Sequence, residues 1–397
     1  MRYDFDKVLD RRGTNCIKYD FTAENGMPED IIPLWVADMD WQAPDEVRER
    51  LIEMAEHGIY GYSGGKESYF RAVAGWMEDS HGWKVEKDWM VSAPGVVFAI
   101  AAAIRAFTEK GDSVMIQRPV YYPFGKMIEE NGRVIADNTL RRENGRYTMD
   151  FEDMERQIAD SNVRLFILCN PHNPVGRVWR EDELRRLGEV CLKYGVLIVS
   201  DEIHHDFIFP GHRHVVLADL DERFRDITVT CTAPSKTFNI AGLQASNIFI
   251  ANPRMREAFR KEISKTGYDG LNMMALGACE SAYRCGRDWL EELLVYLKGN
   301  MDFAREFLDR RVPGVKLVEP EGTYLLWLDC RELGLEHDEL EDLMVHKAGL
   351  WLDGGQMFGE AGAGFQRVNM ACPRAILEAA FEKLAAAVEG LKDRRHT

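Results

Sequence analysis

The chain has 397 residues, 46% of them apolar, so it is long enough to bury a large core and to form two or three domains. It carries 66 acidic against 50 basic residues, a formal charge of -16. A protein with this net negative charge lacks the electrostatic attraction to the phosphates of nucleic acids and anionic lipids. We therefore expect neither nucleic acid nor anionic membranes as partners.

The N-terminal residues 1–12 alternate in charge and contain no apolar segment typical of a secretory signal. The longest strongly apolar stretch, 96–104, is too short to cross a bilayer. We therefore expect a cytoplasmic protein. Its eight cysteines include no C-x-x-C pair and no spacing typical of zinc sites, which predicts reduced, mostly structural thiols.

Short apolar runs alternate with helical patterns through the middle of the chain. The runs that predict buried strands are 113–117, 133–137, 164–170, 196–202, 227–233 and 245–250. The helical patterns are 96–107, 122–130, 151–158 and 181–194, the last followed by Gly195 as a helix-ending residue. This alternation predicts an α/β fold with a mostly parallel, doubly wound sheet, in which ligands bind beyond the carboxyl ends of the strands.

Beyond residue 250 the pattern changes. It predicts helices at 255–263, 289–308, 340–347 and 375–391, and strands at 323–329 and 364–370. These elements indicate a second, smaller α+β domain. We expect a large domain at 46–289, a small domain at 290–397, and an N-terminal segment, 1–45, that packs with the small domain.

Two charged side chains stand where predicted strands end. Asp201 closes the run 196–202, and Lys236 follows the run 227–233. A lysine buried at such a position has a lowered pKa and can attack an aldehyde, and a nearby aspartate can keep a pyridine nitrogen protonated. Spacing alone favours the simpler alternative of a solvated loop lysine and a helix-capping aspartate.

Three further segments follow predicted strands. Residues 93–97 precede a long helix, so the backbone N-H groups of this turn can face a phosphate. Tyr121 can stack on a flat heterocycle, and Asn173, in the turn 170–176, can donate a hydrogen bond to a phenolate oxygen. Each feature alone fits an ordinary turn or a half-buried loop side chain equally well.

Arg367 lies inside the predicted strand 364–370, where a half-buried guanidinium needs a partner. A carboxylate in bidentate geometry is its best partner, either from a substrate or from an internal acid. The histidines at 204, 205, 212 and 214 straddle a Pro-Gly turn and match no standard zinc spacing, so the sequence predicts no metal site.

Taken in order, these motifs resemble the fold-type I pyridoxal phosphate enzymes of the aspartate aminotransferase superfamily over essentially the whole chain. The motifs that carry the resemblance are 170–176, 200–204, 235–239 and Arg367. Within that superfamily the chain is most similar to the MalY/PatB group of cystathionine β-lyases, also described as carbon-sulfur lyases. The segments 34–40, 57–63, 201–204 and 365–373 resemble signatures of that group.

The resemblance implies a seven-stranded large-domain sheet, pyridoxal 5'-phosphate as cofactor and a Schiff base at the catalytic Lys236. It implies a pyridine-nitrogen partner at Asp201, ring stacking by Tyr121 and an O3' contact from Asn173. It also implies that backbone groups of Val96 and Val97 and the Ser235 hydroxyl hold the phosphate, and that His204 lies near O3'. Tyr62 would contact the phosphate of the neighbouring subunit. Arg367 and Trp35 would bind the substrate. A homodimer with shared active sites follows from the Tyr62 role.

Two positions depart from the wider aminotransferase pattern. His204 replaces a tyrosine that often contacts O3', and Gln244 replaces the usual phosphate-binding arginine. Both favour β-elimination over transamination. The resemblance implies a β-lyase of amino acid metabolism and methionine biosynthesis, which acts on cystathionine or cysteine-type substrates to give a thiol, pyruvate and ammonia. An aminotransferase remains the alternative, because it uses the same first steps. An additional role in binding a regulatory protein partner also stays open.

Overall fold

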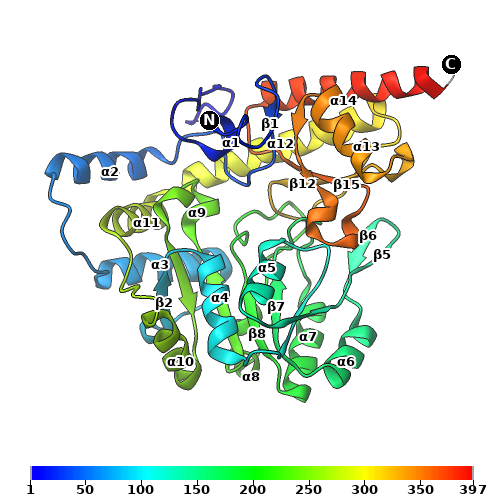
Figure 1. The fold of residues 1–397 in the computed structure, drawn as a ribbon. Helices are drawn as coiled ribbons and strands as arrows, with labels where there is room; N and C mark the ends of the chain where they lie inside the picture. The colour runs from blue at the N-terminus through cyan, green and yellow to red at the C-terminus, as the bar shows by residue number, and fades with distance from the viewer. Residues whose placement is uncertain (1, 396–397) are drawn as a thin grey trace.

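The computed structural model describes residues 2–395 and centres on a large mixed sheet (Figure 1). In this part of the chain the sheet has seven strands in the order β2-β10-β9-β8-β7-β3-β4. Their bounds are β2 (Met90–Ala93), β3 (Ser113–Ile116), β4 (Val134–Asp137), β7 (Val163–Cys169), β8 (Leu197–Asp201), β9 (Thr228–Thr232) and β10 (Ser246–Phe249). Strand β10 runs antiparallel to both neighbours and the other pairings are parallel. The predicted doubly wound, mostly parallel sheet is confirmed.

Helices cover both faces of this sheet, which explains why its strands are apolar along their whole length. Successive side chains of β7 point to opposite faces. Leu165 and Ile167 pack under α4 (Val96–Phe107), α5 (Pro123–Glu130) and α10 (Pro253–Ser264), whereas Phe166 and Leu168 pack under α6 (Phe151–Asp160), α7 (Glu181–Tyr194) and α8 (Glu222–Arg225). The helix α7 ends at Gly195, which has a φ of 69° as its predicted capping role requires.

The C-terminal part forms a second sheet, with order β11-β12-β15-β14 and antiparallel pairing throughout its described strands. Its elements are β11 (Lys316–Val318), β12 (Leu325–Asp329), β14 (Asp353–Gly354), β15 (Phe365–Asn369), α12 (Arg287–Arg311), α13 (His337–Asp342), a π-helical turn (Leu343–Lys347) and α14 (Arg374–Arg395). The N-terminal β1 (Ile32–Pro33) pairs with β13 (Leu350–Trp351), which joins residues near the start of the chain to this part. The domain borders stay a prediction.

Several elements lie outside the predicted ones. They are α1 (Ile17–Asp20), α2 (Asp45–His57), α3 (Glu67–His81), the hairpin β5 (Arg141–Glu143) and β6 (Arg146–Thr148), the short α9 (Pro234–Thr237) and α11 (Met273–Cys285). Helix α2 stands at the left edge of Figure 1 and is joined to α3 by an extended segment, 58–66. None of the helices within residues 2–395 is long and apolar enough to span a membrane.

Candidate active site

A cavity of about 200 Å³ lies at the carboxyl ends of β7, β8 and β9, where the parallel sheet predicts a ligand site. Its lining includes Val96, Val97, Tyr121, Asn173, Asp201, His204, Ser235 and Lys236, which are eight of the sequence-predicted site residues. Segments from five different strand ends and turns therefore meet in one pocket. Tyr62, Trp35 and Arg367 are not among its lining residues.

Lys236 lies in the short helix α9, which begins at Pro234 directly after β9. Its Nζ donates a hydrogen bond of 2.6 Å to the carbonyl oxygen of Ala37. Burial lowers the pKa of this amine to about 8, an effect that the Asp38 carboxylate opposes and the Arg367 guanidinium reinforces. A larger share of the amine is therefore neutral and nucleophilic near neutral pH than for an ordinary lysine.

Asp201 is the last residue of β8 and is 5% exposed. Its Oδ1 accepts a hydrogen bond of 3.1 Å from the backbone N-H of Ile203, so this oxygen is held in place. Burial raises the pKa of the carboxyl group to about 7, while the Ile203 hydrogen bond and the charge of Lys236 oppose that shift. A cationic N-H group bound in the pocket would stabilise the buried Asp201 carboxylate by pairing with it.

The pocket also contains groups that are suited to an anion. Val96 and Val97 form the first turn of α4, whose N-H groups have no partner within the helix and carry its positive dipole end. Ser235 and Gln244 also line this pocket and contribute neutral donors. Gln244 has a left-handed φ of 57°. With glutamine in place of arginine, an anion here is held by dipoles and neutral hydrogen-bond donors.

Tyr121, Asn173 and His204 also line the pocket. The backbone N-H of Tyr121 donates to the carbonyl of Asn173 at 3.1 Å, which ties the two loops together. His204 is 3% exposed, and its Nδ1 has no hydrogen-bond partner among the described residues. Burial, aided by the charge of Lys236, holds the pKa of His204 well below its ordinary value, so the ring is neutral. A buried ring nitrogen without a partner indicates a ligand that supplies one.

These observations test whether pyridoxal phosphate fits the residues present. An acid, a helix N-terminus, an unpartnered imidazole nitrogen and a low-pKa amine line the same pocket. The cofactor's pyridine nitrogen, phosphate, phenolate oxygen and aldehyde need groups of these kinds. The pocket fits the cofactor that the sequence predicted.

Arg367 is 2% exposed and is paired with an internal acid. The sequence left open whether its partner is an internal acid or a substrate carboxylate. It pairs with Asp353, which lies opposite it where β14 and β15 pair. Its Nη1 donates to Asn173 Oδ1 at 3.1 Å and its Nη2 to the Trp35 carbonyl at 2.8 Å. Nε of Arg367 has no partner among the described residues, so the guanidinium keeps a free donor.

Trp35 belongs to a segment, 35–38, that lies across the site. The Trp35 ring stacks on Trp351, with centroids 4.4 Å apart. Asn369 holds the segment by donating to the carbonyls of Val36 at 2.6 Å and Asp38 at 2.5 Å. The Ala37 carbonyl accepts from the Tyr324 hydroxyl at 2.9 Å as well as from Lys236.

Sequence reasoning missed four residues that shape this site: Asp38, Tyr324, Asp353 and Asn369. Asp38 and Asn369 fall within segments that resemble the MalY/PatB group, but the resemblance implies no role for either. Tyr324 lies in a predicted strand, and nothing in the strand pattern marks it as a site residue. Asp353 gave no signal, because its strand β14 is only two residues long.

Tyr62 lies away from the pocket of its own chain. It is fully exposed on the segment 58–66, together with Ile59 and Tyr60. Nothing within the described residues covers its ring, so the structure of one chain gives Tyr62 no site to act in. Its predicted role requires a second chain.

Residues 29–384 match the family model described as aminotransferase class I and II, and the chain belongs to this family. The fold, the strand-end pocket and the order of the motifs agree with that membership.

Within the family, the chain is 46% identical over 385 residues to cystathionine beta-lyase PatB of Bacillus subtilis (strain 168), covering 97% of this chain and 100% of PatB. It is 32% identical to protein MalY of Escherichia coli (strain K12), covering 98% of this chain and all of MalY. The crystal structure of cystalysin from Treponema denticola, which contains pyridoxal 5'-phosphate, superimposes with a TM-score of 0.95 at 39% identity, over 98% of this chain and 100% of that one. The resemblance to fold-type I enzymes and to the MalY/PatB group is confirmed.

The raised pKa of Asp201 has a consequence for stability. Because burial lifts this pKa from 3.8 to about 7, the folded state of the cofactor-free protein holds the proton more tightly than the unfolded state, and Asp201 lowers stability as the pH rises between those values. We expect Asp201→Asn to gain stability relative to the wild type by about 1.4 kcal/mol per pH unit between about pH 5 and pH 7.

Urea denaturation of both cofactor-free proteins over this pH range measures the difference. Asp10→Asn, at a position whose side chain is 74% exposed, serves as the control and should show no such trend. A difference between Asp201→Asn and wild type that stays constant with pH would contradict the assigned environment of Asp201.

Proposed function

We propose that this protein is a pyridoxal phosphate-dependent carbon-sulfur β-lyase. It cleaves the Cβ-S bond of cystathionine or another cysteine-type substrate, including cysteine S-conjugates, and yields a thiol, pyruvate and ammonia. The observation that carries the proposal is the low-pKa amine of Lys236 in one pocket with Asp201 and the α4 N-terminus. Relatives named as cystathionine β-lyases and C-S lyases support the reaction class.

The cofactor, when bound, supplies an electron sink that stabilises negative charge at the substrate's α-carbon. Asp201 would keep a proton on the ring nitrogen, and the N-H groups of Val96 and Val97 with the Ser235 hydroxyl would hold the phosphate. Asn173 and His204 would bind the phenolate oxygen, and the Tyr121 ring would stack on the heterocycle. Together these residues would hold the ring and exclude water from it.

Lys236 moves the proton. As a free neutral amine it would take the proton from the substrate's α-carbon as general base. Its pKa of about 8 lies close to the operating range that makes a base efficient. The same amine, once protonated, stands beside the departing sulfur and can give up its proton there.

Arg367 orients the substrate by binding its α-carboxylate. In the structure this guanidinium is already paired with Asp353, so an incoming carboxylate must share it or use its free Nε donor. Asn173 and the Trp35 carbonyl hold the guanidinium plane in place whichever carboxylate it binds. The stacked rings of Trp35 and Trp351 form a rigid apolar wall close to this position.

The family's name keeps an aminotransferase as the second candidate. Binding, orientation and proton removal use the same residues in both reactions. Elimination releases a thiol from the substrate, whereas transamination releases no thiol and needs a keto acid as the second substrate. Substitution of the usual tyrosine and arginine by His204 and Gln244 favours elimination, and so does 46% identity to PatB.

An assay that follows products separates the two candidates. We expect the purified holoenzyme and cystathionine to give pyruvate, ammonia and homocysteine in equal amounts without any added keto acid. Lys236→Ala should lower this rate by about 10²–10⁴-fold, the usual contribution of a general base. Amino transfer that requires a keto acid and releases no thiol would overturn the lyase proposal.

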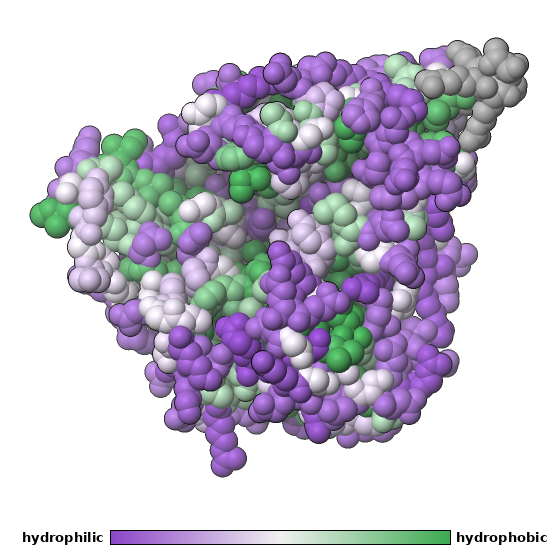
Figure 2. Space-filling model, in the orientation of Figure 1, coloured by the Kyte–Doolittle hydropathy of each residue, from purple (hydrophilic) through white to green (hydrophobic). Residues whose placement is uncertain are grey.

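We also propose that the enzyme acts as a homodimer in which Tyr62 reaches the phosphate site of the neighbouring chain. Apolar side chains gather at the left of the molecule, where α2 projects (Figure 2). Ile52, Ile59 and Tyr60 are more than half exposed there, beside the fully exposed Tyr62. Burial of these side chains against a second chain would remove their apolar surface from water. A cytoplasmic location stays a prediction.

Subunit mixing tests the Tyr62 proposal. A Lys236→Ala chain keeps Tyr62, and a Tyr62→Ala chain keeps Lys236, so a hybrid dimer regains one complete site. We expect the refolded mixture to be much more active than either parent. As control, Lys236→Ala mixed with the double variant contains no complete site and should stay inactive. Activity of the first mixture no higher than that of its parents would rule out a shared site.

A further inference from the structure

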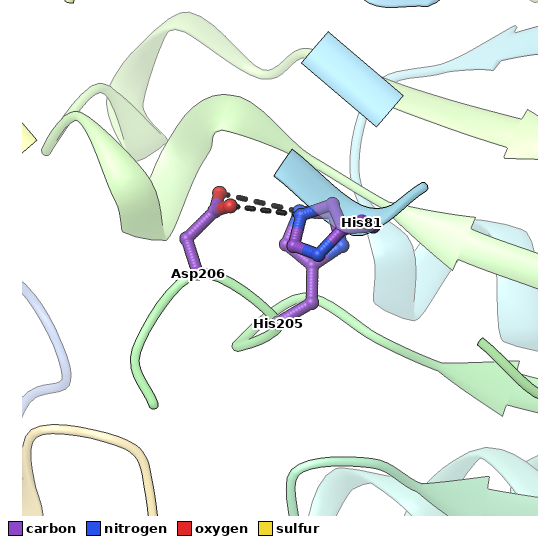
Figure 3. A group of neighbouring side chains, drawn as sticks. All are labelled: His81, His205 and Asp206. Atoms are coloured by element: carbon purple, nitrogen blue, oxygen red, sulfur yellow. Dashed lines mark hydrogen bonds and ion pairs between the residues drawn. The ribbon is translucent and has the colours of Figure 1, made fainter. Parts of the chain in front are cut away.

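A second group of titratable side chains lies behind the proposed cofactor site. His204 lines the cofactor pocket, but the next residue, His205, lines a different cavity of about 720 Å³. His81, the last residue of α3, and Asp206 line the same cavity. His81 comes from the end of α3, and His205 and Asp206 come from the segment after β8. Both imidazole rings lie beside the carboxylate (Figure 3).

The spacing of these donors is close to that of a metal coordination sphere. His81 Nε2 lies 2.9 Å from Asp206 Oδ1, and His205 Nε2 lies 3.3 Å from Asp206 Oδ2. One ligand atom from each residue falls within 4.8 Å of the other two. Ligands bound tetrahedrally to Zn²⁺ at about 2.0–2.1 Å stand roughly 3.3 Å from one another. The two imidazole rings are stacked, with centroids 4.2 Å apart and an interplanar angle of 26°, so one ring must turn for both nitrogens to face the same ion.

His205 provides a second, independent indication of a ligand. Its side chain is 0% exposed, and neither ring nitrogen makes a hydrogen bond within the described residues. Both nitrogens of a buried imidazole are normally satisfied, because an unpaired polar group in the interior is costly. The contact with Asp206 lacks hydrogen-bond geometry, so it does not remove this cost.

We propose that His81, His205 and Asp206 bind one divalent transition-metal ion of the zinc class, with water from the adjoining cavity as the fourth ligand. Two imidazoles and one carboxylate suit such an ion, whereas Mg²⁺ and Ca²⁺ prefer oxygen ligands throughout.

The surroundings of Asp206 indicate what the ion does. The carboxylate also accepts hydrogen bonds from the Trp76 indole at 3.1 Å and from Thr237 Oγ1 at 2.6 Å. Thr237 follows Lys236 in α9, so an ion on Asp206 would tie α3 to the helix that carries the reactive amine. The ion would therefore stabilise the position of α9 relative to α3.

The sequence predicted no metal site at the histidines 204, 205, 212 and 214. The structure brings only His205 of these into the proposed ligand set and adds His81, 124 positions earlier in the chain. His214 stays outside it, paired at 2.8 Å with Glu202 next to the cluster. His212 lines the same cavity but is not one of the proposed ligands, which makes it a matched control.

Titration of the chelator-treated holoenzyme with Co²⁺ tests the proposal. Co²⁺ replaces Zn²⁺ in such sites and has ligand-field absorption at longer wavelengths than the cofactor. We expect one Co²⁺ per chain, with affinity reduced about 100-fold or more in His205→Ala and in the more conservative His81→Gln, and unchanged in His212→Ala. Circular dichroism and retained cofactor absorption establish that the variants are folded. Absence of Co²⁺ absorption, or Co²⁺ binding that both ligand variants keep, would overturn the proposal.

Discussion

Burial of the Lys236 amine is the constraint on which the proposed site depends. A lysine in this position loses hydration, which lowers its pKa to about 8, and its Nζ gains the Ala37 carbonyl as a partner at 2.6 Å. The carbonyl is available only because the segment 35–38 is fixed across the sheet edge. Asn369 and Tyr324, from the C-terminal sheet, hold this segment.

The N-terminal segment is in turn anchored by buried charge. Lys18 is 0% exposed and pairs with Asp40 at 2.9 Å, and Arg11 binds both Asp38 and Asp40. Breaking such a pair would leave an uncompensated charge in the interior, which costs far more than a surface ion pair gains. These ion pairs hold the N-terminal segment in place near Lys236, although the segment is far from Lys236 in sequence.

The large sheet and the polar residues at its strand ends were predictable from the sequence, because both follow from local rules. Continuous apolar runs mark strands that are buried on two faces, and parallel strands bring their carboxyl ends, with Asp201 and Asn173, to one edge. Contacts between distant segments follow no such rule. Asp353 meets Arg367 through a two-residue strand, and His81 meets His205 from the end of a separate helix. Tyr62 has no recognisable role within one chain, because the surface that it would contact belongs to another.

The lysine that carries the cofactor can be identified directly, and we expect it to be Lys236. Borohydride reduction of the holoenzyme makes the bond between pyridoxal phosphate and its lysine permanent, and peptide mass spectrometry then locates it. The structure predicts the added cofactor mass on the peptide that contains Lys236, because burial there gives the amine its lowered pKa beside Asp201 and the α4 N-terminus. Labelling of a different lysine, or of none, would contradict the account.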